Sequence, residues 1–223
     1  MVHKGQTQFV LGMNFAKALE KYIIYSGVEI AMVGNIPNYT KYDILRCFLR
    51  LSVNIGRQEL SRELGLGEGT VRTILNILKS KTLLDSTKKG HFLSREGILK
   101  LDKLFDNIKM PKIIETNLVY PEHKKIAVLL KKSNGLKEIY RLRDVAVKNR
   151  AEGALILKFE NGLYAPESDF KGDFSELNGY FEFENGDLLI IAFSGDLKNA
   201  ETGALAVAVE LNDTLKKFIE NFE

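Results

Sequence analysis

The sequence predicts an α+β protein in two parts: a basic, helical first half and a second half with a mostly antiparallel sheet and helices on one face. Apolar residues recur every three or four positions between residues 55 and 80, whereas short apolar stretches and Asn-Gly pairs follow Pro111. The charge changes at the same point. Residues 1–110 hold 17 Lys and Arg against 10 Asp and Glu, and residues 111–223 hold 15 against 19. A basic module joined to an acidic one is typical of a nucleic-acid reader with a separate pairing or sensing domain.

Residues 55–80 carry a helix-turn-helix pattern. Ser61 is the small residue expected where two crossing helices approach most closely, and Gly65 supplies the positive φ that the turn requires. The second helix begins near Gly67. Its buried stripe consists of four apolar residues, Val71, Ile74, Leu75 and Leu78. The residues that would face solvent or a groove are polar: Glu68, Thr70, Arg72, Thr73, Asn76 and Lys79. Taken alone, the pattern also fits a helical hairpin inside a core.

The flanking segments extend this pattern into a winged helix. Before it, Thr40 and Asp43 form a capping pair that opens a helix. After it come a strand, a basic turn, a returning strand and a closing helix, at residues 82–86, 87–90, 91–93 and 98–108. We therefore predict a winged-helix domain at residues 39–110, which ends before Pro111 because proline cannot extend the preceding helix.

Residues 40–108 resemble the winged-helix domains of transcription regulators. The segments IGRQELSRELGLGEGTVRTIL and KKGHFLSREG are similar to an archaeal family that joins such a domain to a C-terminal domain of unassigned function. The resemblance implies binding to double-stranded DNA through the second helix and the wing, carried here by Thr70, Arg72, Thr73, Asn76, Lys88, Lys89 and His91. At the tip of the second helix this sequence has Gly67 and Gly69, where many relatives have larger polar residues. Fewer side chains are therefore left to read bases.

The cations of this module are candidates for neutralising DNA phosphates. Arg57 and Gln58 would contact the backbone ahead of the second helix. The full cationic set is Arg57, Arg62, Arg72, Lys79, Lys81, Lys88, Lys89 and Arg95. Any single one of them could equally be a solvated surface charge.

The alternatives to a DNA-binding regulator are a module that binds RNA or another protein, and an enzyme domain with a regulatory winged helix.

Residues 1–38 are interpreted as an N-terminal extension. Residues 14–25 form a possible amphipathic helix, and translation could begin at Met1 or at Met32. The extension has no apolar run long enough for a signal peptide or a membrane span. A single cysteine, Cys47, excludes an intramolecular disulfide. These features predict a cytoplasmic protein.

Residues 111–223 are expected to form the sheet and its helices. The predicted strands lie at residues 112–120, 124–130, 154–159, 163–165, 179–183 and 188–193, and the predicted helices at residues 136–150 and 199–222. The last helix is small and apolar almost all round, so it must be covered on most sides. Either a second copy of the chain or the chain's own sheet would cover it. We predict that this domain pairs two copies as a homodimer, senses a small-molecule effector, or does both.

No pattern in the chain predicts a catalytic, metal or cofactor site. His3, His91 and His123 are too far apart to suggest metal ligands, and Cys47 lies among apolar residues as a structural thiol would. The turn at residues 194–196 precedes a helix and could hold an anion, although we favour a plain strand-to-helix turn. Several acidic residues are interpreted as a solvated face and not as metal ligands: Glu167, Asp169, Asp173, Glu176, Glu182, Glu184 and Asp187.

Overall fold

The computed structural model describes residues 38–118, 120–132, 136, 138–166 and 172–222. Residues 39–223 form one compact unit. The helix predicted at residues 14–25 and the alternative start at Met32 lie outside the described residues. None of the helices within the described ranges is both long and apolar enough to cross a bilayer.

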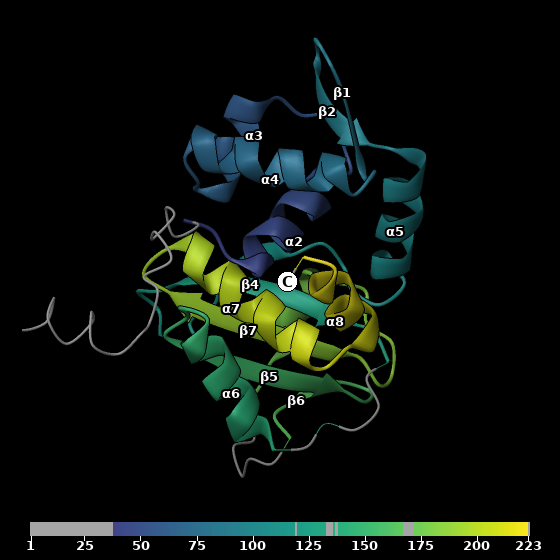
Figure 1. Ribbon diagram of the computed structural model, residues 1–223. Coiled ribbons are helices and arrows are strands. Elements are labelled where there is room, and N and C mark those ends of the chain that lie inside the picture. The colour runs from purple at the N-terminus through teal and green to yellow at the C-terminus, as the bar shows by residue number, and fades with distance from the viewer. Residues whose placement is uncertain (1–37, 119, 133–135, 137, 167–171, 223) are drawn as a thin grey trace, which may run out of the picture. The chain divides into compact units, whose positions relative to one another are not determined.

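The first part of this unit has the predicted order of a winged helix (Figure 1). Its helices are α2 (Lys41–Arg50), α3 (Arg57–Leu64), α4 (Glu68–Ser80) and α5 (Arg95–Phe105), and its wing is the antiparallel pair β1 (Leu84–Thr87) and β2 (Gly90–Leu93). Thr40 and Asp43 form the capping box at the start of α2, and Gly65 takes a φ of 61° at the end of α3. These local signals were therefore interpreted correctly.

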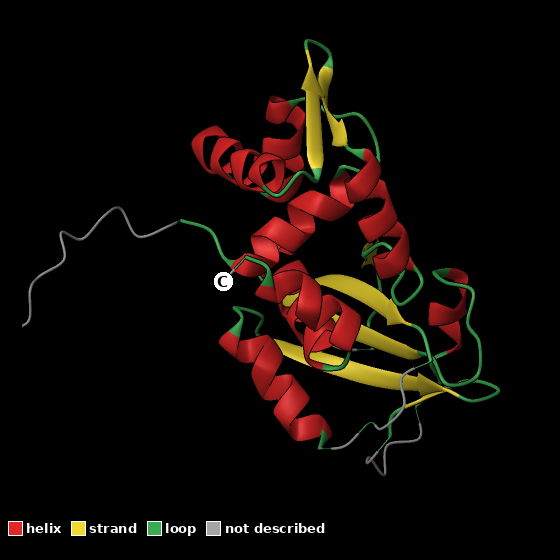
Figure 2. Cartoon of the chain, turned by 45° about the vertical axis from the view of Figure 1, so that its right-hand side comes forward, coloured by secondary structure: helices red, strands yellow, loops and turns green. Residues whose placement is uncertain are grey.

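The second part is a five-stranded sheet in the order β3-β4-β7-β5-β6, and all its pairings are antiparallel. The strands are β3 (Lys112–Ile114), β4 (Lys124–Leu130), β5 (Gly153–Phe159), β6 (Leu163–Tyr164) and β7 (Leu188–Ser194). Three helices lie on one side of this sheet, as Figures 1 and 2 show: α6 (Ile139–Lys148), α7 (Leu197–Glu210) and α8 (Asp213–Glu220). The predicted α+β class, a winged helix followed by a mostly antiparallel sheet with helices on one face, is confirmed. The division at residue 110 stays a prediction.

The strand predicted at residues 179–183 was wrong. The chain instead forms a short 3-10 helix, η1 (Ser175–Gly179), and then crosses the sheet face opposite the helices without pairing. Phe181 is buried there in a second apolar cluster with Leu129 and Leu189. The Tyr180 hydroxyl bonds both backbone groups of Glu115. Alternating Phe and Glu therefore mark an extended segment lying on a sheet, a pattern that sequence alone does not separate from a strand.

The single helix predicted at residues 199–222 was also wrong, because it is divided into α7 and α8. Asn212 interrupts it with an extended backbone, and its side-chain oxygen accepts from Leu215 N at 3.0 Å to cap α8. The Asn212 amide also donates to Asn107 Oδ1 at 2.9 Å. The Asn-Asp pair at residues 212–213 is a capping signal.

Helix α7 is the centre of the larger core. Every residue from Ala200 to Val209 is buried, against the sheet, α6, α2 and α8. The intrachain alternative therefore accounts for its small, apolar composition, and this helix offers no free face to a second copy. The same cluster continues into the winged helix, where the Phe48 and Phe218 rings stand 4.7 Å apart between centroids.

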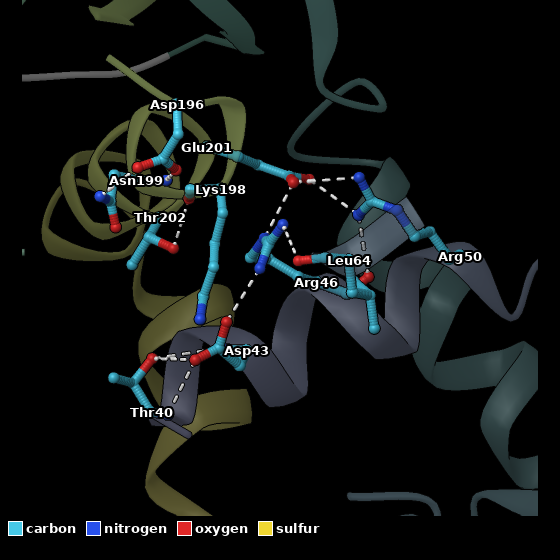
Figure 3. A network of polar contacts seen from close by, with 10 residues as sticks. All are labelled: Thr40, Asp43, Arg46, Arg50, Leu64, Asp196, Lys198, Asn199, Glu201 and Thr202. Carbon is cyan, nitrogen blue, oxygen red and sulfur yellow. Dashed lines mark hydrogen bonds and ion pairs between the residues drawn. The ribbon is translucent and has the colours of Figure 1, made fainter. Parts of the chain in front are cut away.

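A buried ion pair joins the winged helix to α7 (Figure 3). Arg46 Nε donates to Glu201 Oε2 at 2.8 Å, and the two side chains are 1% and 3% exposed. The remaining guanidinium nitrogens of Arg46 donate to Asp43 Oδ1 at 2.9 Å and to the Leu64 carbonyl at 3.0 Å. Arg50 donates to both Glu201 oxygens, at 2.8 and 3.0 Å. The buried charges are thus paired and hydrogen-bonded, the condition under which burial of an ion pair is tolerated.

Glu201→Ala is expected to lower the free energy of unfolding by about 3–5 kcal/mol, because the buried Arg46 would keep only Asp43 as a carboxylate partner and Arg50 would lose both its bonds to Glu201. The matched control is Glu210→Ala at the end of the same helix, where an exposed carboxylate stands 3.9 Å from Lys216 Nζ. That change should cost less than about 1 kcal/mol. Urea denaturation followed by circular dichroism measures both, and equal losses would contradict the assigned role of Glu201.

Gly203→Ala is expected to destabilise the protein by about 1–3 kcal/mol through overpacking, although alanine is the better helix former. A Cβ on Gly203 would lie 2.5 Å from Ala151 Cβ. Gly69→Ala in α4 is the control, since no atom lies within 4 Å of the added methyl. It should raise stability by up to about 1 kcal/mol. A gain from Gly203→Ala would show that α6 and α7 are packed less closely than described.

Candidate nucleic-acid interface

One polar face of α4 points away from the core. Val71, Ile74, Leu75 and Leu78 are buried on the other face, as predicted. Of the outward residues, Arg72, Thr73, Asn76 and Lys79 are exposed and Thr70 is half-buried. The Thr73 hydroxyl donates to Gly69 O at 3.1 Å, so the Thr73 hydroxyl oxygen can still accept a hydrogen bond. Within the described residues, the side chains of Arg72, Asn76 and Lys79 have no hydrogen-bond or ion-pair partner, so their donors are available to a ligand.

The start of α3 lies beside the start of α4. Arg57 Nη2 is 3.1 Å from Glu68 Oε2, so this pair connects the two helix starts. Arg57 Nε is buried and has no partner among the described residues. Gln58, the next residue, is exposed. Arg57 is thus partly neutralised by Glu68, a feature the sequence pattern did not reveal.

The wing carries its cations at the tip. Lys88 and Lys89 are exposed in the turn between β1 and β2, and Lys89 N donates to Thr87 Oγ1 at 3.2 Å. Gly90 follows with a φ of 145° where a Cβ would meet the Ile55 carbonyl oxygen at 2.9 Å, so only glycine fits this turn.

His91 lies on β2, one residue pair from the turn of the wing, and is close to the α3 and α4 cations Arg57 and Lys79. Its Nδ1 is 2.8 Å from Ser86 Oγ, and its backbone pairs with Ile55. Burial lowers the pKa of His91, and the charges of Arg57 and Lys79 lower that pKa further. The ring is therefore neutral near pH 7 and offers a hydrogen bond instead of a charge. The same electrostatic coupling shows that Arg57, Lys79 and His91 lie close together.

Two other basic residues of the module lie elsewhere. Arg62, on the last turn of α3, lines a cleft with Lys198 and Glu201 of α7. Lys81 lines a small pocket with Phe218 and Phe222 of the C-terminal end. The predicted DNA-contacting residues lie on α4, at the start of α3 and on the wing. We call this set the α4–wing surface: Arg57, Gln58, Thr70, Arg72, Thr73, Asn76, Lys79, Lys88, Lys89 and His91.

The turn at residues 194–196 is a strand-to-helix turn, the plainer of the two predicted readings. Asp196 Oδ1 accepts from Asn199 N at 2.8 Å and caps α7. The Gly195 N–H is used as well, because it donates to Glu152 Oε1 at 2.8 Å. The bond from Gly195 has the largest effect on the Glu152 carboxyl and holds its pKa below the usual value; the bond from His123, at 2.6 Å, lowers that pKa further.

The described residues contain no group of three His, Cys, Asp or Glu side chains placed to hold a metal ion. Asp187 is buried and accepts from the backbone N–H groups of Lys132 and Glu184, at 3.1 and 2.9 Å, so it organises two loops. Burial raises the pKa of the Cys47 thiol to about 12, which fits the predicted structural role. Glu167 and Asp169 lie outside the described residues.

Two family models match the chain. The PH0730-like N-terminal domain matches residues 40–99, and a domain of unknown function (DUF4443) matches residues 121–211. Among curated proteins, the central glycolytic genes regulator of Bacillus subtilis (strain 168) is 36% identical over 69 residues, which are 31% of this chain. The match spans 20% of that regulator's length.

Two solved structures are similar to different degrees. The match to S. agalactiae BusR in complex with its busAB promotor DNA covers 78% of this chain and 99% of that chain, with 16% identity and a TM-score of 0.23. The hypothetical protein PH0730 from Pyrococcus horikoshii OT3 has a TM-score of 0.67 and covers 81% of this chain. Because PH0730 is 31% identical and is matched over 99% of its length, the chain belongs to the PH0730-like family.

Proposed function

We propose that the protein is a DNA-binding transcription regulator that docks on double-stranded DNA through the α4–wing surface. The observation that carries the proposal is the grouping of unpartnered donors on this one surface. The side chains of Arg72, Asn76 and Lys79 on α4 have no hydrogen-bond or ion-pair partner within the described part of the chain, and Lys88 is exposed at the wing tip. Arg and Asn are the side chains that form paired hydrogen bonds with base edges, and Lys neutralises phosphates.

The geometry of α4 suits entry into a major groove. The helix has 13 residues and only its inner face is buried. Gly67 begins it without a side-chain cap, and no atom lies within 4 Å of a Cβ built on Gly67 or Gly69. The helix tip is therefore narrow, and its first N–H groups are available to a DNA phosphate. The same glycines leave few side chains for base contacts, so docking would depend more on the backbone than on sequence.

The comparisons support this proposal at the level of the module. The matched B. subtilis protein is named as a regulator of glycolytic genes, and the shared segment is 69 residues long. Which genes this chain would control does not follow from that match, because only a fifth of the regulator's length is covered. Recovery and sequencing of genomic fragments bound by the purified chain would identify the operator.

The second part of the chain is proposed to pair two copies, to bind an effector, or both. A homodimer would present two winged helices to a two-fold DNA site. Since α7 is covered within the chain, pairing must use another surface; Ile98 and Leu99 of α5 are 50% and 56% exposed. Light scattering that gives a monomer mass at high concentration would contradict pairing.

An RNA- or protein-binding role for the winged helix would instead appear as DNA affinity that is absent or insensitive to salt.

Arg72→Ala is expected to weaken binding to a recovered DNA fragment by up to about 3 kcal/mol, because its guanidinium would lose contacts in the groove. A gel-shift titration measures the change. Arg143→Ala on α6 is the matched control: this arginine is also exposed on a helix, and it is outside the α4–wing surface. Equal affinities for both variants and the wild type would remove α4 from the interface.

The Lys88→Ala/Lys89→Ala variant is expected to bind DNA less salt-dependently. If each lysine neutralises one phosphate, the slope of log affinity against log salt should fall by about 2. Affinity measured at four or five salt concentrations gives the slope. Lys103→Ala/Lys217→Ala removes the same charge from exposed positions away from the wing and should keep the wild-type slope. A wild-type slope in both variants would contradict a phosphate contact by the wing.

A further inference from the structure

A cleft of about 570 Å³ lies between the end of α3 and the start of α7. This volume is within the range of sites that hold small organic ligands. Both parts of the chain line it. Arg50 and Arg62 come from the winged helix, whereas Arg150 and Lys198 come from the sheet part. None of these residues belongs to the α4–wing surface, so the cleft is a separate feature.

The cations in the cleft differ in whether they are already neutralised. Arg50 and the buried Arg46 are held by Glu201, and the Asp196 carboxylate is used by Asn199 at the start of α7. The side-chain nitrogens of the other three lining cations have no hydrogen-bond or ion-pair partner within the described ranges: Arg62, Arg150 and Lys198. Figure 3 shows the Lys198 side chain extending from α7 toward α2 with no interaction drawn to it. Five cations thus line one cleft with three carboxylates, Glu63, Asp196 and Glu201, which leaves an excess of two positive charges.

This arrangement selects for a multiply charged anion. Two arginines offer planar forks that match the oxygens of a phosphate, and Lys198 adds a point charge. The positive end of the α7 dipole lies at the same place, because Leu197, Lys198 and Asn199 are its first residues. A phosphate monoester carries nearly two negative charges near pH 7, which suits three cations better than a single carboxylate does. We infer that the cleft is a binding site for a small phosphorylated molecule.

An anion in this cleft would contact the helix-turn-helix directly. A Cβ placed on Gly65, in the turn between α3 and α4, would be 3.8 Å from Lys198 Cβ. The carbonyl of Leu64, the residue before this turn, accepts the bond from Arg46. The ligand would therefore touch the winged helix and the sheet part together. This step rests on the proposed function as a DNA-binding regulator. In that function, the phosphorylated molecule is the effector that alters DNA binding.

The test uses the full chain and inorganic pyrophosphate as the probe, in isothermal titration calorimetry at fixed ionic strength. We expect saturable binding to the wild type. The variant Arg62→Gln/Arg150→Gln/Lys198→Gln keeps three hydrogen-bonding side chains and loses the charge. It should bind at least about tenfold more weakly, since charge-assisted hydrogen bonds to the phosphate are lost. Circular dichroism checks that the variant is folded.

The matched control, Lys103→Gln/Arg143→Gln/Lys217→Gln, removes three exposed charges outside the cleft and should bind as the wild type does. Absence of saturable binding to the wild type would overturn the proposal. So would an equal loss in both triple variants, because that would reflect net charge alone.

A second measurement tests the effector role by gel shift with and without pyrophosphate. We expect the DNA affinity of the wild type to change and that of the cleft variant to stay constant. An unchanged affinity in the wild type, or the same change in both, would overturn the effector role. If no DNA is bound at all, the proposed function fails while the calorimetry still decides whether the cleft binds the anion.

Discussion

The contact between Arg46 and Glu201 fixes how the winged helix is attached to the rest of the chain. A buried ion pair contributes little net stability, because desolvation offsets most of its attraction. It nevertheless constrains the geometry, since Arg46 and Arg50 of α2 must both lie within hydrogen-bond distance of Glu201 on α7. Arg46 also holds the Leu64 carbonyl at the end of α3. The guanidinium groups of Arg46 and Arg50 therefore help to position the helix-turn-helix over the sheet part, while the surrounding apolar core supplies the stability.

The apolar side of this arrangement is centred on α7. Its residues from Ala200 to Val209 are buried on all sides, between the sheet and the winged helix. Small side chains allow this, because the helix can approach its neighbours closely; Gly203 stands against Ala151 where a methyl group would not fit. A helix that touches both parts gives them one continuous core. The two parts that the charge pattern separates are thus physically joined.

The signals that sequence reasoning read correctly are local, and the features it missed are long-range. Thr40 with Asp43, and Gly65, encode their caps within a few residues, so the winged helix was predictable. The break at Asn212 was hidden because apolar spacing continues across it. The side chains that meet in the cleft are far apart in the sequence: Glu201 lies 151 positions from Arg50. Nothing in a charge count shows that Arg62, Arg150 and Lys198 converge.

The helix α3 connects the two surfaces of interest. Its first residue, Arg57, belongs to the α4–wing surface, and its last turn, with Arg62 and Leu64, borders the cleft. Eight residues of α-helix span about 12 Å. A helix this short is expected to move as a unit. If an anion at Arg62 shifts the α3 backbone, Arg57 would move with it, and Arg57 is paired with Glu68 at the start of α4. The proposed anion site would then be linked to the α4–wing surface through α3.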